Sequence, residues 1–130
     1  MDRGKLLHRL AIWGPVAGYL ALIFYLSSQS RIPWARLAPD YLEHGVEYAG
    51  LAVVLARALN DGLGRPVPRR TLLLTLLLCV AYAATDEIHQ RFVPDRYSDI
   101  MDVLSDAVGS CLGLIVLHLA QWMRAGGDAA

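Results

Sequence analysis

The sequence predicts an all-α fold, an integral membrane bundle of four transmembrane helices formed by a single domain over residues 1–130. Hydrophobic residues make up 55% of the chain and charged residues only 18%. The apolar residues gather in four blocks rather than spreading along amphipathic stripes. Because a helix that crosses a bilayer needs about 20 mainly apolar residues, this pattern favours a membrane protein over a soluble globule.

The first span is expected over about residues 8–28. Residues 10–27 are 18 positions without a charge, and at about 1.5 Å each they nearly cover the hydrocarbon thickness. Pro15 lies inside this block and predicts a kink, because its ring removes one helical hydrogen bond. The block is longer than the core of a typical secretory signal, and we expect the helix to be retained.

Three further spans are expected over about residues 42–60, 70–89 and 101–123. The second is the weakest, because Glu47 lies inside it and Arg57 lies near its end. Arg57 is expected to extend towards the inner headgroups. The third contains 15 uncharged residues and the fourth 17, and both become long enough only when neighbouring charged residues are included.

The charged residues predict the orientation of the bundle. With four spans, both termini and the second connection share one side, and they hold eight of the twelve basic residues against three acids. By the positive-inside rule this side is cytoplasmic. The opposite side carries four arginines and nine acids. The chain is therefore predicted to lie in the cell membrane, multi-pass, with both termini cytoplasmic and an acidic extracytoplasmic side.

Polar residues recur at helical spacing at the outer ends of the second, third and fourth spans. Steps of three and four residues place side chains on one face of a helix. Ionised groups facing lipid would cost a few kcal/mol each on insertion scales. We therefore expect them to face inward and form an extracytoplasmic-side acidic pocket. The stripes are Asp40, His44, Glu47 and Tyr48; Tyr82, Asp86, Glu87, His89 and Gln90; and Asp99, Asp102 and Asp106.

The polar stripe of the fourth span continues into small residues. Gly109 and Gly113 enclose the motif G-S-C-L-G, a pattern of small residues that lets a neighbouring helix backbone approach closely. We therefore expect the fourth helix to pack through one face that is small in the middle and acidic at its start. Ser98 or Asp99 is the expected N-cap of this helix.

The same residues resemble the VanZ-like family of membrane proteins, whose namesake is associated with teicoplanin resistance. Three motifs carry the resemblance: D-Y-L-E-H-G-V-E-Y over residues 40–48, D-E-I-H-Q-R-F-V-P-D-R over residues 86–96, and D-I-M-D-V-L-S-D-A-V-G over residues 99–109. The S-S-Q-S that ends the first helix is also similar. The resemblance implies a small multi-pass protein of the cell envelope, with a role in teicoplanin resistance or envelope modification.

Two positions depart from the family pattern. Tyr41 stands where the family usually has Lys, and Asp106 stands where it usually has Asn. Asp106 therefore replaces a neutral hydrogen-bonding group by one that can ionise. If the asparagine of the family serves as a neutral hydrogen-bonding group, the resemblance implies either that Asp106 is protonated or that the site has changed its ligand.

Three functional hypotheses remain open from the residues. In the first, the polar groups form a structural network in a scaffold or lipid-binding protein, with Arg91 and Arg96 paired to carboxylates. In the second, a divalent metal is bound by His44, Glu47, Asp86 and His89. In the third, a histidine beside Asp86 or Glu87 acts as a general base on a lipid-linked substrate.

These hypotheses share one set of candidate residues. The catalytic candidates are His44, Glu47, Asp86, Glu87 and His89, and the binding candidates are Asp40, Tyr48, Gln90, Arg96, Asp99, Asp102 and Asp106. The expected partners are the lipid bilayer and an envelope lipid or cell-wall precursor, with no nucleic acid. Oligomeric state is left open.

Overall fold

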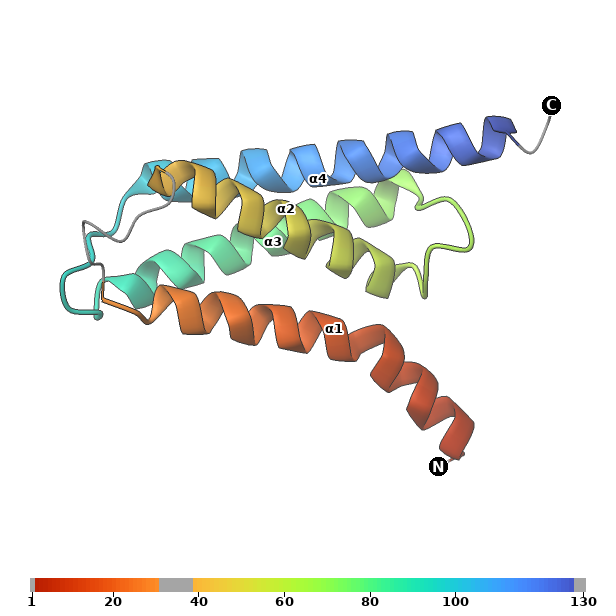
Figure 1. Cartoon of the computed structure of the whole chain (residues 1–130), viewed down its shortest axis with the longest axis horizontal. Coiled ribbons are helices and arrows are strands. Elements are labelled where there is room, and N and C mark those ends of the chain that lie inside the picture. Colours follow the sequence, from red (N-terminus) through yellow and green to blue (C-terminus); the bar gives the residue numbers. More distant parts are fainter. Residues whose placement is uncertain (1, 31–38, 128–130) are drawn as a thin grey trace.

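The chain folds into four helices that run in alternating directions. The computed structural model describes residues 2–30 and 39–127, and within them it contains no strand. The helices are α1 (Arg3–Ser27), α2 (Asp40–Leu59), α3 (Arg69–Gln90) and α4 (Ile100–Gly127). Both ends of the chain lie towards the same end of the bundle as the α2–α3 connection (Figure 1). The predicted all-helical fold is confirmed. Each helix begins before its predicted span; α1 and α2 end one residue before the predicted end, and α3 and α4 extend beyond it.

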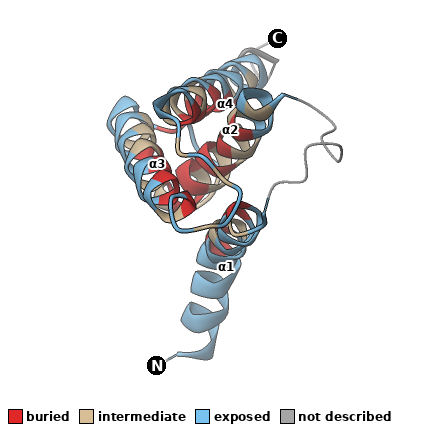
Figure 2. Ribbon diagram, turned by 90° about the vertical axis from the view of Figure 1, so that its left-hand side faces the viewer, coloured by how far each residue is buried: buried red, intermediate tan, exposed pale blue. Residues whose placement is uncertain are grey.

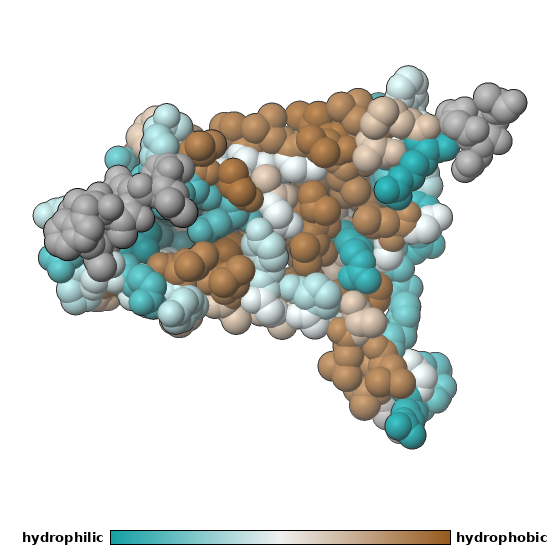
Figure 3. Space-filling view, viewed as in Figure 1, coloured by the Kyte–Doolittle hydropathy of each residue, from teal (hydrophilic) through white to brown (hydrophobic). Residues whose placement is uncertain are grey.

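The side chains of α3 are arranged as a bilayer requires. Leu73 and Leu77 point outward and are 67% and 65% exposed, whereas Thr75 and Asp86 are buried. Apolar residues also cover much of the surface along the length of the bundle (Figure 3). An apolar outside with a polar inside is stable only in lipid, because water would favour the opposite arrangement.

Three of the described helices, α1, α3 and α4, are long and apolar enough to cross a membrane. The protein is therefore a membrane protein. Helix α2, which the sequence predicts to be the weakest span, does not meet the same criterion. Its buried residues include His44 and Tyr48 beside apolar groups. Its place in the bundle therefore depends on what it packs against.

Helix α1 bends away from the bundle in its N-terminal half (Figures 1 and 2). Pro15 lies inside this helix and has no N–H to donate to the carbonyl group of Ala11. Arg57 of α2 supplies donors here, since its Nη1 lies 3.4 Å from the carbonyl oxygens of both Ala11 and Ile12. The expectation that Arg57 extends to the headgroups is thus corrected, because a kinked helix offers it a nearer acceptor.

Helices α2 and α4 form the closest contact in the bundle. A Cβ atom added at Gly109 would collide with the carbonyl oxygen of Gly45, and one added at Gly113 would collide with that of Ala49. These pairs are offset by the same number of residues, so the two helices run side by side in the same direction (Figure 1). The small-residue face predicted for the fourth helix is therefore its contact with α2.

The half of the bundle that contains the chain termini has an apolar interior. Its buried side chains are small and aliphatic, and Cys79 lies among them as a free thiol that is 0% exposed. This packing closes the bundle below the polar end described next. The buried residues are Leu51, Ala52, Leu55, Ala56, Cys79, Ala83, Leu114 and Leu117.

Gly109→Ala should destabilise the bundle, because the added methyl group would push α4 away from Gly45. Overpacking of this kind costs about 1–3 kcal/mol, which exceeds the gain of up to about 1 kcal/mol from replacing a helical glycine. Gly18→Ala is the matched control, since nothing lies within 4 Å of a Cβ atom at that position. Unfolding in mixed detergent micelles would measure both, and a Gly109→Ala protein as stable as the Gly18→Ala protein would contradict the close contact.

Candidate functional site

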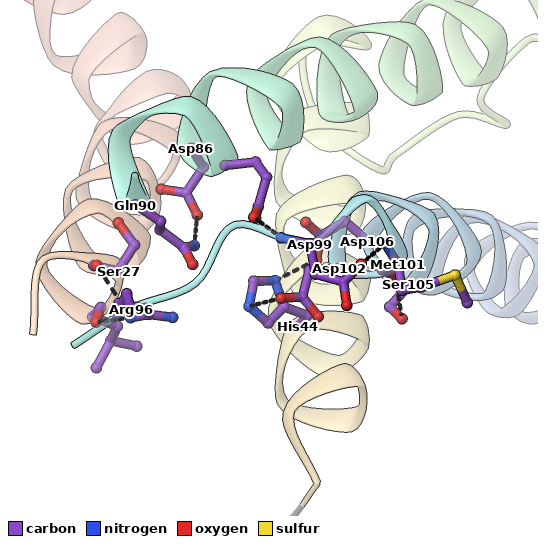
Figure 4. Close-up of polar contacts among 12 residues, drawn as sticks. Ser27, His44, Asp86, Gln90, Arg96, Asp99, Met101, Asp102, Ser105 and Asp106 are labelled. Carbon is purple, nitrogen blue, oxygen red and sulfur yellow. Dashed lines mark hydrogen bonds and ion pairs between the residues drawn. The ribbon is translucent and has the colours of Figure 1, made fainter. Parts of the chain in front are cut away.

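Polar side chains from α2, α3 and α4 are buried together at the end of the bundle opposite the chain termini (Figure 4). We call them the polar network. Each of its members is at most 7% exposed, which is unusual for ionisable groups. Burial of this kind requires that the members satisfy one another or bind water. The polar network consists of His44, Tyr48, Asp86, Glu87, Gln90, Asp102 and Asp106.

His44 and Asp106 form the centre of the polar network. Nδ1 of His44 lies 3.1 Å from Oδ1 of Asp106, and its Nε2 lies 3.9 Å from Oδ2 of Asp102. The imidazole therefore lies between two carboxyl groups of α4 (Figure 4). The parallel packing of α2 and α4 sets this pairing, because the offset in residue number between His44 and Asp106 is close to that between Gly45 and Gly109.

A second group of the polar network lies on α3. Gln90 donates from Nε2 to Oδ2 of Asp86 over 3.1 Å, one helical turn away. Glu87 accepts a hydrogen bond at Oε1 from the backbone N–H of Asp99. Asp99 in turn accepts at Oδ1 from the N–H of Met101 over 2.9 Å, which makes it the N-cap of α4. Glu87 thus attaches the end of α3 to the start of α4.

Arg96 lies in the α3–α4 connection and fastens it to α1. Its Nη1 donates to the carbonyl oxygens of Leu26 and Ser27 at 3.0 and 3.1 Å, which are exposed where α1 ends. Partial burial lowers the pKa of the Arg96 guanidinium, and four nearby carboxylates oppose this shift. Within the described residues, no arginine forms an ion pair with a carboxylate, so the pairing expected for Arg91 and Arg96 is corrected.

His89 points away from the polar network. Its Nε2 lies 3.0 Å from Oγ of Ser28, and its ring packs 4.6 Å from that of Phe24, both from the end of α1. The expected placement of His89 beside Asp86 is therefore wrong. Among the residues that the structure describes, no three His, Cys, Asp or Glu side chains are arranged to hold a metal ion. His89 thus lies against α1, apart from the hydrogen bond between His44 and Asp106.

The remaining candidates lie at the border of the polar network. Glu47 is half-buried and within electrostatic range of Asp86 and Asp106. Asp40 begins α2 and is half-buried, and Asp99 is exposed at the start of α4. Tyr48 is completely buried, with its ring 6.3 Å from that of Tyr82. The structure thus brings together the inner candidates and leaves Asp40 and Asp99, at the starts of α2 and α4, at the rim.

One polar residue of this region was not predicted from the sequence. Ser110 is 0% exposed, and its hydroxyl group lies 3.5 Å from the carbonyl oxygen of Tyr48 on α2. The sequence contains a signal for the burial of Ser110, because this residue follows Asp106 by one helical turn and lies on the same face. The face of α4 that contacts α2 therefore consists, from its start, of Asp102, Asp106, Gly109 and Ser110, and Gly113.

The arrangement around His44 can hold and orient a proton. A histidine ring that pairs with one carboxyl group through Nδ1 and lies near a second through Nε2 is fixed in orientation, and the carboxyl groups can stabilise a positive charge on it. Asp106 suits this role better than the asparagine that the family pattern has at its position. Both residues can accept a hydrogen bond from His44, but only Asp106 can also stabilise a positive charge on the ring.

Removing either His44 or Asp106 alone should be more damaging than removing both. His44→Leu leaves Asp106 buried without this partner, and Asp106→Leu does the same to His44, at a cost of about 3–5 kcal/mol each. The free energy of unfolding lost in the double variant should be smaller than the sum of the losses in the two single variants. The matched control is the exposed pair His8 and Asp61, which lie 2.7 Å apart and whose coupling should be about 0–1 kcal/mol. Equal coupling energies for the two pairs in a double-mutant cycle would contradict a buried pair.

Comparison with known proteins bears on the whole of this arrangement. The family model described as VanZ/LLP1 matches residues 9–121, which include α2, α3, most of α1 and α4, and every member of the polar network. No curated protein and no solved structure matches the chain. The match agrees with the resemblance carried by the three motifs around His44, Asp86 and Asp102. The chain belongs to the VanZ/LLP1 family.

Proposed function

We propose that this protein acts in the cell envelope, at the extracytoplasmic side of the cell membrane, and that it protects the cell against glycopeptide antibiotics of the teicoplanin type. One observation carries the proposal. Helix α2, unlike the other three helices, lacks the apolar composition of a membrane span, and it buries His44 against Asp102 and Asp106. Polar groups that are costly in a membrane are retained where they serve a function.

The proposed side of the membrane follows from charge. The end of the bundle that holds both termini and the α2–α3 connection carries eight basic residues and three acids. The positive-inside rule then favours a cytoplasmic location for that end. The polar network lies at the other end, within reach of envelope lipids and cell-wall precursors, which are the partners that we propose.

Acid–base chemistry on a lipid-linked envelope substrate is a second candidate function. The position of His44 supports it, because a base held by one carboxyl group through Nδ1 and placed near another through Nε2 is oriented for proton transfer. In this function His44 would take a proton from the substrate, and Asp106 would stabilise the charged ring. A purely structural role for the polar network would need neither the substrate nor the orientation.

Expression in a teicoplanin-susceptible Gram-positive host tests the proposal. The wild-type chain should raise the minimum inhibitory concentration of teicoplanin by several dilution steps, and His44→Gln should abolish the increase. The His8→Ala variant should keep it, because His8 lies at the opposite end of the bundle. Immunoblots of isolated membranes would establish that the variants accumulate equally.

Asp106→Asn separates the two candidate functions. Asparagine keeps a hydrogen bond to His44 but cannot stabilise a charged ring, so a binding or protective role should survive this change while proton transfer should fail. If expression of the wild-type chain leaves the minimum inhibitory concentration of teicoplanin unchanged, this result contradicts the proposed protection. An increase that persists in His44→Gln would remove the polar network from the mechanism.

A further inference from the structure

Three buried polar atoms at the polar end of the bundle have no hydrogen-bond partner among the described residues. They are Oη of Tyr48, Oε1 of Gln90 and Nε of Arg96. The side chains of Tyr48 and Gln90 are 0% and 1% exposed, so bulk solvent does not reach them directly. Buried polar groups in folded proteins are almost always paired with protein or with ordered water. Unpaired buried atoms of this kind therefore indicate bound water.

Two of these three side chains adjoin carboxyl groups of the polar network. Gln90 already donates to Asp86, which leaves its carbonyl oxygen to accept. Tyr48 lies one helical turn after His44 on α2, and its ring is 6.3 Å from that of Tyr82, which is one turn before Asp86 on α3. Arg96 donates through Nη1 to the end of α1, and its Nε is the third atom.

The polar network is divided into two groups. His44, Asp102 and Asp106 form one group, and Asp86 and Gln90 form the other (Figure 4). No direct hydrogen bond between described residues joins the first group to the second. Tyr48 lies between the helices that carry the two groups, because it follows His44 by one turn on α2 and its ring faces that of Tyr82, one turn before Asp86 on α3. It is therefore placed to link them, provided that water completes the hydrogen bonds.

The buried carboxyl groups of the polar network require protons as well as water. Asp86, Glu87, Asp102 and Asp106 are each at most 7% exposed. Nearby like charges in a poorly solvated site are not all ionised together. Some of these carboxyl groups therefore carry a proton.

We propose that ordered water joins the two groups of the polar network, and that Asp86 and Asp106 share protons through this water and the hydroxyl group of Tyr48. A protonated carboxyl group gives its proton to the adjacent water, and the last water passes a proton to the other carboxylate. Tyr48 takes part by accepting a proton at Oη while its own proton leaves, so one O–H bond forms for each that breaks. This inference does not depend on the proposed action on the envelope.

The proton site is open to one side of the membrane only. Beyond Tyr48 the buried side chains are mainly apolar, including Leu51, Leu55, Leu114 and Leu117, and the buried Thr75 donates to the carbonyl oxygen of Thr71 on its own helix. Such packing holds no chain of water. Protons therefore exchange with the polar end and do not cross. The titratable groups that face the site are Tyr19 of α1, His44 and Glu47 of α2, Cys79, Tyr82, Asp86 and Glu87 of α3, Arg96 of the connection, and Asp102 and Asp106 of α4.

Infrared spectroscopy of the purified full-length protein in lipid nanodiscs tests the proposal. The wild-type protein should show a carbonyl stretching band of a protonated carboxyl group that shifts on transfer to D₂O. Asp106→Asn or Asp86→Asn should weaken it. Tyr48→Phe should change its frequency and slow its exchange several-fold, because the link through Oη is lost. Tyr41→Phe is the matched control and should change neither, since Tyr41 is 61% exposed.

Thermal unfolding of the same proteins gives an independent readout. If water solvates Oη of Tyr48, Tyr48→Phe should lower the midpoint; if the hydroxyl group is buried dry, the same change should raise it. A raised midpoint, a wild-type spectrum without the exchangeable band, or a band that Tyr48→Phe leaves unchanged would each overturn the proposal. If Tyr48→Phe does not fold, the wild-type band and its response to Asp106→Asn decide whether the carboxyl groups share protons.

A proton leak across the membrane of proteoliposomes that contain the protein would contradict a site open to one side only.

Discussion

The backbone contact between α2 and α4 positions the other features of the polar end. Because Gly109 and Gly113 have no side chains, α4 lies against Gly45 and Ala49 of α2. Two parallel helices fixed in this way have a fixed register. That register brings the imidazole of His44 level with the carboxyl group of Asp106, and wider packing would separate them.

The same contact explains how a helix as polar as α2 is held within the bundle. Its composition alone does not qualify it as a span, so the energy that keeps it in place comes from packing against α4 and from buried hydrogen bonds. His44 and Tyr48, which would be costly against lipid, are turned inward and buried. Arg57 at the other end of α2 donates to the carbonyl groups exposed by the kink at Pro15. These three polar residues of α2 thus each face another helix.

Helical periodicity in the sequence predicted the helices and the inward face of the fourth one well. It failed for His89, although the information was present. At about 100° per residue, Asp86, Glu87 and Gln90 centre on one face of α3, and His89 lies roughly 100° away from that centre. Grouping residues by steps of three and four placed it with Asp86, while its position around the helix directs it to Ser28 of α1.

The arginines could not be placed from periodicity at all. Charge complementarity suggested that Arg96 pairs with carboxylates, but it donates to the carbonyl oxygens of Leu26 and Ser27 at the end of α1. Those acceptors are backbone groups left without helical partners, and they are invisible in a side-chain pattern. The pairing of His44 with Asp106 was likewise beyond the sequence, because it depends on the distance between two helices rather than on the face of either.

Whether α2 crosses the membrane is tested most directly by labelling cysteines on either side of it. In a chain whose own Cys79 and Cys111 are replaced by alanine, Gln29→Cys places a single exposed thiol just after α1, and Gly64→Cys places one just after α2, so the two positions lie on either side of α2 in the chain. A membrane-impermeant maleimide added to intact cells should label position 29 and should label position 64 only after the membrane is opened. Labelling of both positions from the outside, or of neither, would show that α2 does not span and would contradict the four-helix membrane bundle.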